Sequence, residues 1–298
     1  MMNQSYGQKC EQEFSLYQKN NHVFLSDKLK IVNENGSKIK YIEGFNKNSD
    51  SEPLVVSKYT KLSNLIKSIK GGTFYFSSPE KWLDPFEMFF YKSKFNIGNE
   101  NCVIHASCFA CNDIENEEGF WNIWSKGERE PIVRVTYDVE KLLHALNEQA
   151  CNKYDFYLGG MIYTSRKEIF EARKNVPDSY EKIEDCFNKL CLKRNAYRYE
   201  NELRLFVKSV VKSNYDIKET IIENIDYSQG IIEEITLAPA NPFGNSHLLR
   251  DKMREHQTCL NSPIKTEIQK ILNEKEIKCK INQSALYCTD IKERTFVI

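Results

Sequence analysis

The feature that most constrains the fold is a series of short strand-like segments that follow one another between Leu54 and Leu237. Segments such as "TFYFS", "CVIHASCFA" and "PIVRVTY" alternate apolar and polar residues or are almost entirely apolar, as half-buried and buried strands are. Some of these segments are neighbours in sequence, and others are separated by short amphipathic helices. This mixture indicates an α+β fold.

The pattern predicts strands over Leu54–Tyr59, Thr73–Ser77, Cys102–Ala110, Pro131–Tyr137, Phe156–Thr164, Glu202–Val207, Ile231–Leu237 and Ile277–Ile281. Helices are expected over Thr60–Lys70, Phe120–Lys126, Val139–Lys153, Asp178–Arg194 and from Pro263 to Leu272. Gly71-Gly72 ends the first of these helices, Asp138 is an N-cap for the third, and Ser262 caps the last.

Before this core, His22–Val32 and Lys38–Phe45 alternate on either side of Asn35-Gly36, a pair that supplies the positive φ angles of a tight hairpin turn. We therefore expect three parts. These are an N-terminal hairpin extension over 1–52, a core over 53–240, and a C-terminal helix-and-strand extension over 241–298 that packs on the core.

The chain has 298 residues and is 41% hydrophobic, which is enough for a sizeable core. Its 42 basic and 42 acidic residues balance, which argues against broad, sequence-independent nucleic-acid binding. No apolar run is long enough to cross a membrane, and the N-terminus has no signal-peptide pattern. We expect a cytoplasmic protein without a membrane partner, whose ten scattered cysteines are buried free thiols.

Several common site motifs are missing, including the glycine-rich nucleotide loops, G-x-S-x-G and H-E-x-x-H. The five histidines are well separated, and the Cys108–Cys111 pair has no second ligand pair at zinc spacing. Carboxylate chemistry remains, and it directs attention to Glu200 and Glu202 in "YRYENELRLFVK". Taken alone, these acids are typical of a charged strand end that pairs with Arg198 and Arg204.

Three segments together resemble a known family: "SKYTKLSNLIKSIKGGTFYFSSPEKWLDPFEM", "SCFACNDIENEEGFWNIWSKG" and "YENELRLF". Their order is similar to a widespread bacterial domain family with the pattern K-Y, F-S-x-P, D-P-F-E, C-F and E-x-E-x-R. The chain departs from it at Trp124-Ser125, where the family usually has a tyrosine. The layout is also remotely similar to ADP-ribosyltransferases, which carry a late E-x-E or Q-x-E.

That second resemblance implies split antiparallel sheets with surrounding helices, and NAD as the substrate. It implies either transfer to a macromolecular acceptor, protein or nucleic acid, or hydrolysis of NAD. It also implies a setting in toxins or antiviral defence, with an antitoxin or regulatory partner.

Under this resemblance Glu202 is the catalytic acid. Cleavage of the nicotinamide–ribose bond leaves positive charge on the ribose, and a carboxylate that accepts a hydrogen bond from the neighbouring 2-OH stabilises that state. Glu200, two residues earlier, points the same way on an extended chain and orients or deprotonates the acceptor. Arg204 lies on the same strand face and steadies Glu202.

The remaining cofactor-binding candidates come from earlier strands and the tryptophan helix. Lys58 and Tyr59 open the core, and Lys58 suits a phosphate, while a surface lysine beside a packed tyrosine is the plain alternative. Ser77 and Ser78 offer hydroxyls to NAD, or form ordinary turn contacts before Pro79. Trp121 shares a helix face with Trp124 and either stacks on nicotinamide or packs in the core.

Two other functions stay open. Asp84, Glu87, Glu200 and Glu202 are hard oxygen ligands, so a Mg²⁺- or Mn²⁺-dependent nuclease is one alternative. In the structural alternative for the first two acids, Asp84 caps the next element while Trp82 and Phe86 anchor the loop in the core. The second alternative function is a non-catalytic sensor or binding module. Residues 166–208 hold eleven basic and eight acidic side chains, a modest excess that suits an anionic cofactor, RNA or a solvated face.

Overall fold

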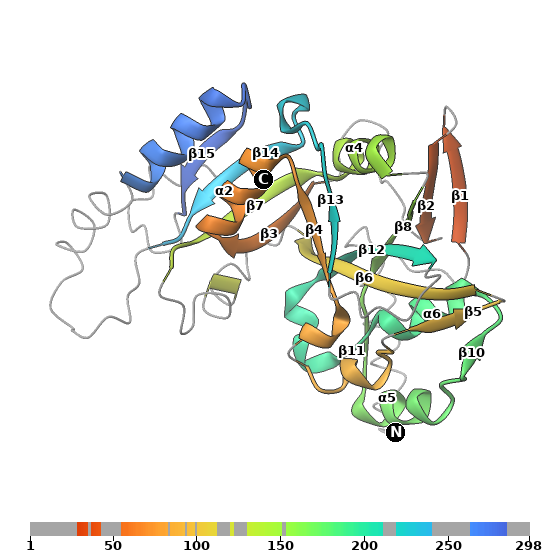
Figure 1. Ribbon diagram of the computed structural model, residues 1–298. Coiled ribbons are helices and arrows are strands. Elements are labelled where there is room, and N and C mark those ends of the chain that lie inside the picture. The colour runs from red at the N-terminus through yellow and green to blue at the C-terminus, as the bar shows by residue number, and fades with distance from the viewer. Residues whose placement is uncertain are drawn as a thin grey trace, which may run out of the picture.

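The computed structural model describes residues 29–34, 37–42, 55–82, 84–92, 94–98, 100–111, 120–121, 130–150, 153–210, 219–239 and 263–284 (Figure 1). Strands and helices are mixed along the chain, and the strands form mainly antiparallel pairs. The expected α+β class is confirmed.

Thirteen of the described strands belong to one sheet. Its main path runs β1-β2-β8-β12-β6-β3-β7-β14-β15, while β4 with β13 and β5 with β10 attach to β6. The strands are β1 Leu29–Glu34, β2 Ser37–Ile42, β3 Val55–Lys61, β4 Phe74–Ser77, β5 Phe95–Ile97, β6 Glu100–Cys111, β7 Ile132–Asp138, β8 Asp155–Gly160, β10 Ser179–Tyr180, β12 Glu202–Val210, β13 Glu219–Ile222, β14 Ile232–Leu237 and β15 Lys280–Gln283. A separate parallel pair joins β9, Ile162–Thr164, to β11, Leu192–Arg194.

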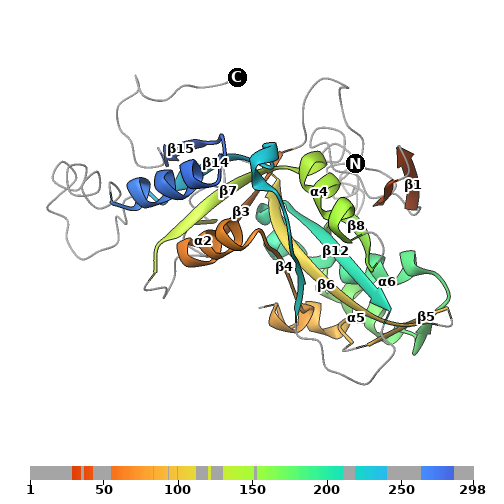
Figure 2. The same cartoon turned by 45° about the horizontal axis from the view of Figure 1, so that its top comes forward.

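The sheet divides into two wings at the contact between β3 and β6. These strands share only two residue pairs, Val56 with Cys111 and Ser57 with Ala110. Four positions further along the same edge, β6 is joined instead by β4, through Ser77 and Ala106. One wing carries β3, β7, β14 and β15, and the other carries β6, β12 and β8, as Figure 2 shows. The expected split of the antiparallel sheet is therefore present.

Helices cover both faces. On one face, α2 (Leu62–Gly71), α4 (Val139–Ala150) and the helix over 263–274 contribute to the larger core. On the other face, α5 (Arg166–Lys174) and α6 (Ile183–Leu190) cover the second core with two loop helices, η1 (Pro79–Lys81) and η2 (Glu87–Phe89). Two further short 3₁₀ helices are η4 (Asn195–Glu200) and η5 (Tyr227–Gln229).

Several local predictions are confirmed. Helix α2 ends at Gly72, whose φ of 58° is left-handed and whose N–H bonds back to Ile69. Asp138 accepts a 3.1 Å hydrogen bond from the N–H of Lys141 and so caps α4. The hairpin is present too, because β1 and β2 pair antiparallel with Glu34 opposite Ser37.

Two predicted elements are wrong in extent. The helix expected over Asp178–Arg194 is only α6, because the chain leaves the helix at Cys191 and the next three residues pair with β9 as β11. The strand expected over Phe156–Thr164 is two strands, β8 and β9, which pair with different partners. Helix α5 was not expected at all.

Both predicted extensions contribute strands to the main sheet. Strand β2 pairs with β8, and β15 pairs with β14, both in parallel. The proposed domain boundaries fall outside the described residues, as do Ser262 and the end of the tryptophan helix, so these stay predictions. Within the described residues, no helix is long and apolar enough to span a membrane.

Candidate functional site

The two acidic motifs of the sequence meet at one lysine. The Lys193 Nζ lies 3.1 Å from a carboxylate oxygen of Glu87, 2.5 Å from Glu200 and 2.6 Å from Glu202. Lys193 comes from β11, Glu87 from η2, and the two other acids from the junction of η4 with β12. The D-P-F-E and E-x-E-x-R segments, more than a hundred residues apart, therefore form a single buried ionic cluster.

Arg204 is the second cation of this cluster. Its Nε donates to Glu202 at 2.6 Å, and one of its terminal nitrogens donates to Glu87 at 2.5 Å. The other terminal nitrogen donates to the carbonyl of Leu190 at 2.7 Å, and the guanidinium lies 3.6 Å from the centre of the Trp82 ring. With 1% of its surface exposed, Arg204 has its charge satisfied almost entirely by the protein.

The local sequence explains how Glu87 reaches the interior. Asp84 accepts a 3.0 Å hydrogen bond from the N–H of Phe86, which fixes the turn that leads into η2. Arg194 pairs with both oxygens of the Asp84 carboxylate: a terminal nitrogen lies 2.9 Å from the oxygen that accepts from Phe86, and Nε donates to the other oxygen at 3.0 Å. The structural role expected for Asp84 is thus confirmed, with an ion pair in addition.

The geometry of the acid pair differs from the expectation. Glu200 is the last residue of η4, and Asn201 takes the left-handed conformation with φ 39° before β12 begins at Glu202. The two acids are therefore not neighbours on one face of an extended strand. Their carboxylates meet because both reach Lys193. The left-handed turn between them is held to β6, since the Asn201 carbonyl accepts a hydrogen bond from the N–H of Cys111.

The two acids also differ electrostatically. Burial raises the pKa of Glu202, but Arg204 and Lys193 outweigh burial and lower it to about 2. Burial, together with the neighbouring Glu202, raises the pKa of Glu200 despite the bond to Lys193. Glu202 is therefore a fixed anion, whereas Glu200 takes up a proton more readily than an ordinary glutamate.

A tyrosine holds the backbone beside Glu202. The N–H of Glu202 donates to the Tyr163 hydroxyl at 2.8 Å, and its carbonyl accepts from the N–H of Met161. Neither Tyr163 nor Lys193 was identified from the sequence. Lys193 lies inside a stretch whose apolar spacing favoured a helix, and its pairing depends on β11, which that interpretation excluded.

Strand register decides which other candidates share a face with Glu202. Ser57, Ala110 and Glu202 are directly opposite one another on β3, β6 and β12, so their side chains project from the same side of the sheet. Tyr59, two residues along β3, projects from that side too. It packs edge-on against Trp121 with ring centres 4.9 Å apart, and both rings cluster with Ala110.

Lys58 points to the opposite face. Its Nζ donates to the Ser107 hydroxyl at 2.5 Å and lies 5.6 Å from the ring centres of Phe74 and Phe109, which belong to the larger core. Lys58 therefore does not share a face with Tyr59 and Glu202, because adjacent residues of β3 face opposite ways.

The two serines bond to other parts of the protein. The Ser77 hydroxyl donates to the carbonyl of Ala106 at 3.3 Å. The Ser78 hydroxyl accepts from the N–H of Glu80, which caps η1, and lies 3.2 Å from the Tyr91 hydroxyl. The bond from Glu80 to Ser78 matches the turn chemistry that was the alternative, whereas Ser77 bonds across to the neighbouring strand β6.

The carboxylates do not form a metal site in the part of the chain that the structure describes. No group of three or more histidine, cysteine or acidic side chains there is arranged to hold a metal ion. The position between Glu87, Glu200 and Glu202 that would suit a cation is occupied by the ammonium group of Lys193. Cys108 and Cys111 lie on the extended strand β6, three positions apart, so their thiols leave opposite faces.

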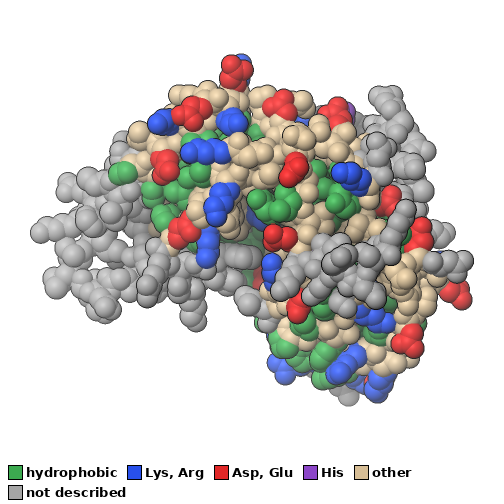
Figure 3. Space-filling view, viewed as in Figure 1, with side chains coloured by type: hydrophobic (Ala, Val, Ile, Leu, Met, Phe, Trp, Pro, Cys, Tyr) green, Lys and Arg blue, Asp and Glu red, His purple; other side chains and the backbone are tan. Residues whose placement is uncertain are grey.

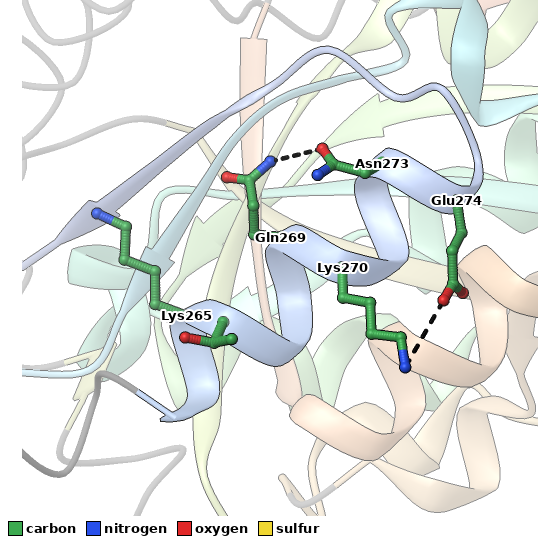
Figure 4. Close-up of a pocket in the computed structure, with 6 residues that line it drawn as sticks. Lys265, Gln269, Lys270, Asn273 and Glu274 are labelled. Carbon is green, nitrogen blue, oxygen red and sulfur yellow. Dashed lines mark hydrogen bonds and ion pairs between the residues drawn. The ribbon is translucent and has the colours of Figure 1, made fainter.

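A surface hollow lies elsewhere, along the helix over 263–274 (Figure 4). Its lining comes from one exposed polar helix face, where Gln269 bonds to Asn273 at 2.9 Å and Lys270 approaches Glu274 at 3.9 Å. None of the candidate site residues contributes to it.

No family model matches the chain, and no curated protein matches it. Two solved structures align with it, titled "Thermus sp. 2.9 DarT in complex with NAD+" and "Thermus sp. 2.9 DarT in complex with carba-NAD+". The first is 10% identical, covers 79% of this chain and 98% of that chain, and has a TM-score of 0.32. The second is 12% identical, covers 78% and 96%, and has a TM-score of 0.33. With such scores the alignments support no conclusion about this chain, and the case for a function rests on its own residues.

Proposed function

We propose that this protein is an ADP-ribosyltransferase-like enzyme, which cleaves NAD and transfers ADP-ribose to a macromolecule, with Glu202 as the catalytic acid. One observation carries the proposal: Glu202 is held as an anion by two cations at the start of β12, beside the split of the sheet. A permanently charged carboxylate suits a reaction whose transition state places positive charge on a ribose ring.

Glu202 has capacity left for that task. Each of its oxygens accepts from one cation, Arg204 or Lys193, and a carboxylate offers about four acceptor positions in all. A ribose 2-OH can therefore donate to Glu202 without breaking either ion pair. The cations keep the carboxylate in one orientation, so little reorganisation is needed during the reaction.

Glu200 has a different proposed role. Its raised pKa brings it closer to the operating pH, which favours proton transfer, and it is less buried than Glu202. In this role Glu200 takes the proton from the attacking group of the acceptor. Lys193 joins the two acids and is a positioning residue.

The face beside Glu202 suits the rest of the substrate. Ala110 separates Glu202 from Ser57 and contributes only a methyl group, while the buried rings of Tyr59 and Trp121 pack next to it. NAD is the proposed substrate, and Arg204 acts through Glu202. Lys58, Ser77 and Ser78 have no part in the proposed site, because their contacts are with other regions.

The experiment follows NAD with a label on its adenylate half, in the presence of single-stranded nucleic acid or cell protein. We expect nicotinamide release and transfer of the label by the wild type, and a loss of both of at least about 100-fold in Glu202→Gln. Glu202→Asp keeps the charge and reports whether position matters, and Glu274→Gln is a control on an exposed helix. The proposal fails if the folded wild type neither releases nicotinamide nor labels any acceptor.

A further inference from the structure

The acid that ends the D-P-F-E segment, Glu87, closes a ring of alternating charges. One of its oxygens lies 3.1 Å from the Lys193 Nζ, and the other accepts from Arg204 at 2.5 Å. Glu202 bridges the same two cations, with one oxygen 2.6 Å from Lys193 and the other 2.6 Å from Arg204. We call these four side chains the charge ring. Removing any member breaks two of its four ion pairs.

The charge ring is enclosed by the protein. Its members keep only between 1% and 8% of their surface exposed. The charged side chains visible in Figure 3 are instead interleaved with neutral ones over the surface. Solvent and salt screen buried ion pairs much less than exposed ones, so each contact in the charge ring restrains the orientation of its partner.

The loop that carries Glu87 is anchored on two sides. The N–H of Glu87 donates to the carbonyl of Asp84 at 3.0 Å, and the Asp84 carboxylate pairs with Arg194 on β11. The ring of Phe86, the residue before Glu87, packs against Phe170 on α5 with 5.5 Å between their centres. Glu87 is therefore a fixed point for two cations that come from other elements.

Glu200 is attached to the charge ring at one corner only. Its carboxylate lies 2.5 Å from the Lys193 Nζ, and among the described residues it forms no other ion pair. The same ammonium group is already shared by Glu87 and Glu202. Glu200 therefore receives only part of the charge of Lys193, and Glu87 competes for the remainder.

The other ionisable groups near Glu200 leave its charge under the control of the charge ring. The hydroxyls of Tyr163 on β9 and Tyr199 on η4 keep their protons, because burial and nearby acids raise the pKa of both. Burial is the main cause of the raised pKa of Glu200, and Lys193 opposes it. The two acids of the charge ring add to the rise.

We propose that Glu87 is a positioning residue of the catalytic site, which fixes the Glu202 carboxylate through Lys193 and Arg204 and keeps Glu200 able to accept a proton; this rests on the proposed function. Without Glu87 both cations lose their second partner and shift, and Glu202 shifts with them. A misplacement of about 1 Å in an active site costs about 100-fold in rate. Lys193 also turns more of its charge to Glu200, which becomes a weaker base.

The first test follows nicotinamide release from NAD in the presence of cell protein and nucleic acid. Glu87→Gln keeps the size of the side chain but removes its charge and one acceptor oxygen. We expect kcat to fall by about 10- to 100-fold, with the KM for NAD changed by no more than about threefold, because Glu87 touches no substrate. The acidic limb of the kcat–pH profile should move down by about one pH unit, since Glu200 loses a competing anion.

Two further variants separate position, charge and stability. Glu87→Asp keeps the charge but is too short to hold both cations, so kcat should fall while the acidic limb stays in place. Asp84→Asn is the matched control, because it breaks another buried ion pair of the same segment without facing Lys193. It should lower the urea midpoint of unfolding and leave the acidic limb unchanged.

A second measurement needs no activity. An NMR titration of protein with isotope-labelled glutamate follows the Glu200 carboxylate, which is identified as the signal that Glu200→Gln lacks. Without NAD, its titration midpoint should be lower by about one pH unit in Glu87→Gln than in the wild type, and unchanged in Asp84→Asn.

The outcomes separate this proposal from the proposed function. If the folded wild type releases no nicotinamide, the proposed function fails, while the NMR titration still decides whether Glu87 acts on Glu200. The Glu87 proposal is overturned if that midpoint does not move, or if folded Glu87→Gln turns over NAD at the wild-type rate. If Glu87→Gln does not fold, Glu87→Asp decides, and an undiminished kcat in that variant overturns the proposal.

Discussion

Two lysines on opposite faces of the same sheet show how differently this fold treats a positive charge. The Lys193 Nζ lies within 3.1 Å of three carboxylates, those of Glu87, Glu200 and Glu202. The Lys58 Nζ lies between two phenylalanine rings and bonds to one hydroxyl. Within the described residues, no carboxylate contacts Lys58, although the residue keeps some exposure to solvent.

Their proton affinities differ accordingly. Burial disfavours the charged form of Lys193, but its three acids outweigh burial and raise its pKa. For Lys58 burial outweighs the opposing effect of Cys108 and lowers the pKa to about 8. Burial alone thus does not determine a charge state, since the partners of the group decide it.

The two lysines therefore have opposite effects on the stability of the fold. Lys193 holds together segments that lie far apart in the sequence, so its charge is part of the fold. Lys58 opposes folding as long as it keeps its proton.

The largest effect is expected from Lys193→Met. It leaves three buried or half-buried carboxylates with Arg204 as the remaining cation of the cluster, and breaking a buried ion pair on one side costs about 3–5 kcal/mol of unfolding free energy. Urea unfolding measures the loss. Lys270→Met makes the same chemical change in an exposed pair with 3.9 Å separation and should cost no more than about 0.5 kcal/mol. Equal losses of unfolding free energy in the two variants would show that the buried ion pairs of Lys193 stabilise the protein no more than an exposed pair does.

A smaller effect is expected from acid. The folded-state pKa of Glu202, about 2, lies below its ordinary value of 4.5, so its ion pairs stabilise the protein above about pH 4.5 and lose that contribution as the pH falls toward 2. Glu202→Gln should therefore cost about 2–3 kcal/mol at pH 7, and the difference from the wild type should shrink in that acid range. Glu200 has a raised pKa, so its protonation favours the folded state as the pH falls. The quantity to follow is therefore the difference in unfolding free energy between the wild type and Glu202→Gln. A difference that stays constant from pH 6 to 3 would contradict the assignment.

Much of the fold could be predicted because its signals are local. The strand segments, the glycine that ends α2 and the Asp138 cap depend on residues a few positions apart. The same kind of signal was present for α5 and was overlooked. Ser165 and Glu168 form a capping box that is visible in "SRKE", but the mainly polar stretch after it lacks a broad apolar stripe.

The candidate site was harder to predict from the sequence, because it depends on the register between neighbouring strands. The motifs drew attention to Glu87, Glu200 and Glu202, which meet at Lys193, yet the sequence does not state that β3 meets β6 at Ser57 and Ala110. A shift of one residue there would exchange the faces of Lys58 and Tyr59. The same applies to Lys193, whose contacts depend on a three-residue strand that apolar spacing alone assigned to a helix.

The smallest effect is expected at Lys58. Lys58→Met keeps a side chain of similar length but removes the charge, so at pH 7 we expect unchanged stability or a gain of about 1 kcal/mol. The folded wild type holds this proton less tightly than the unfolded chain does, with a pKa of about 8 against 10.5. Its unfolding free energy should therefore rise relative to Lys58→Met by about 1–2 kcal/mol between pH 7 and 9.5. Urea titrations of both proteins across that range measure the difference, in which the shared ionisation of tyrosines and cysteines cancels. If the unfolding free energies of the two proteins change with pH in parallel, Lys58 keeps its proton over this range. It would then have an anionic neighbour, as Lys193 does.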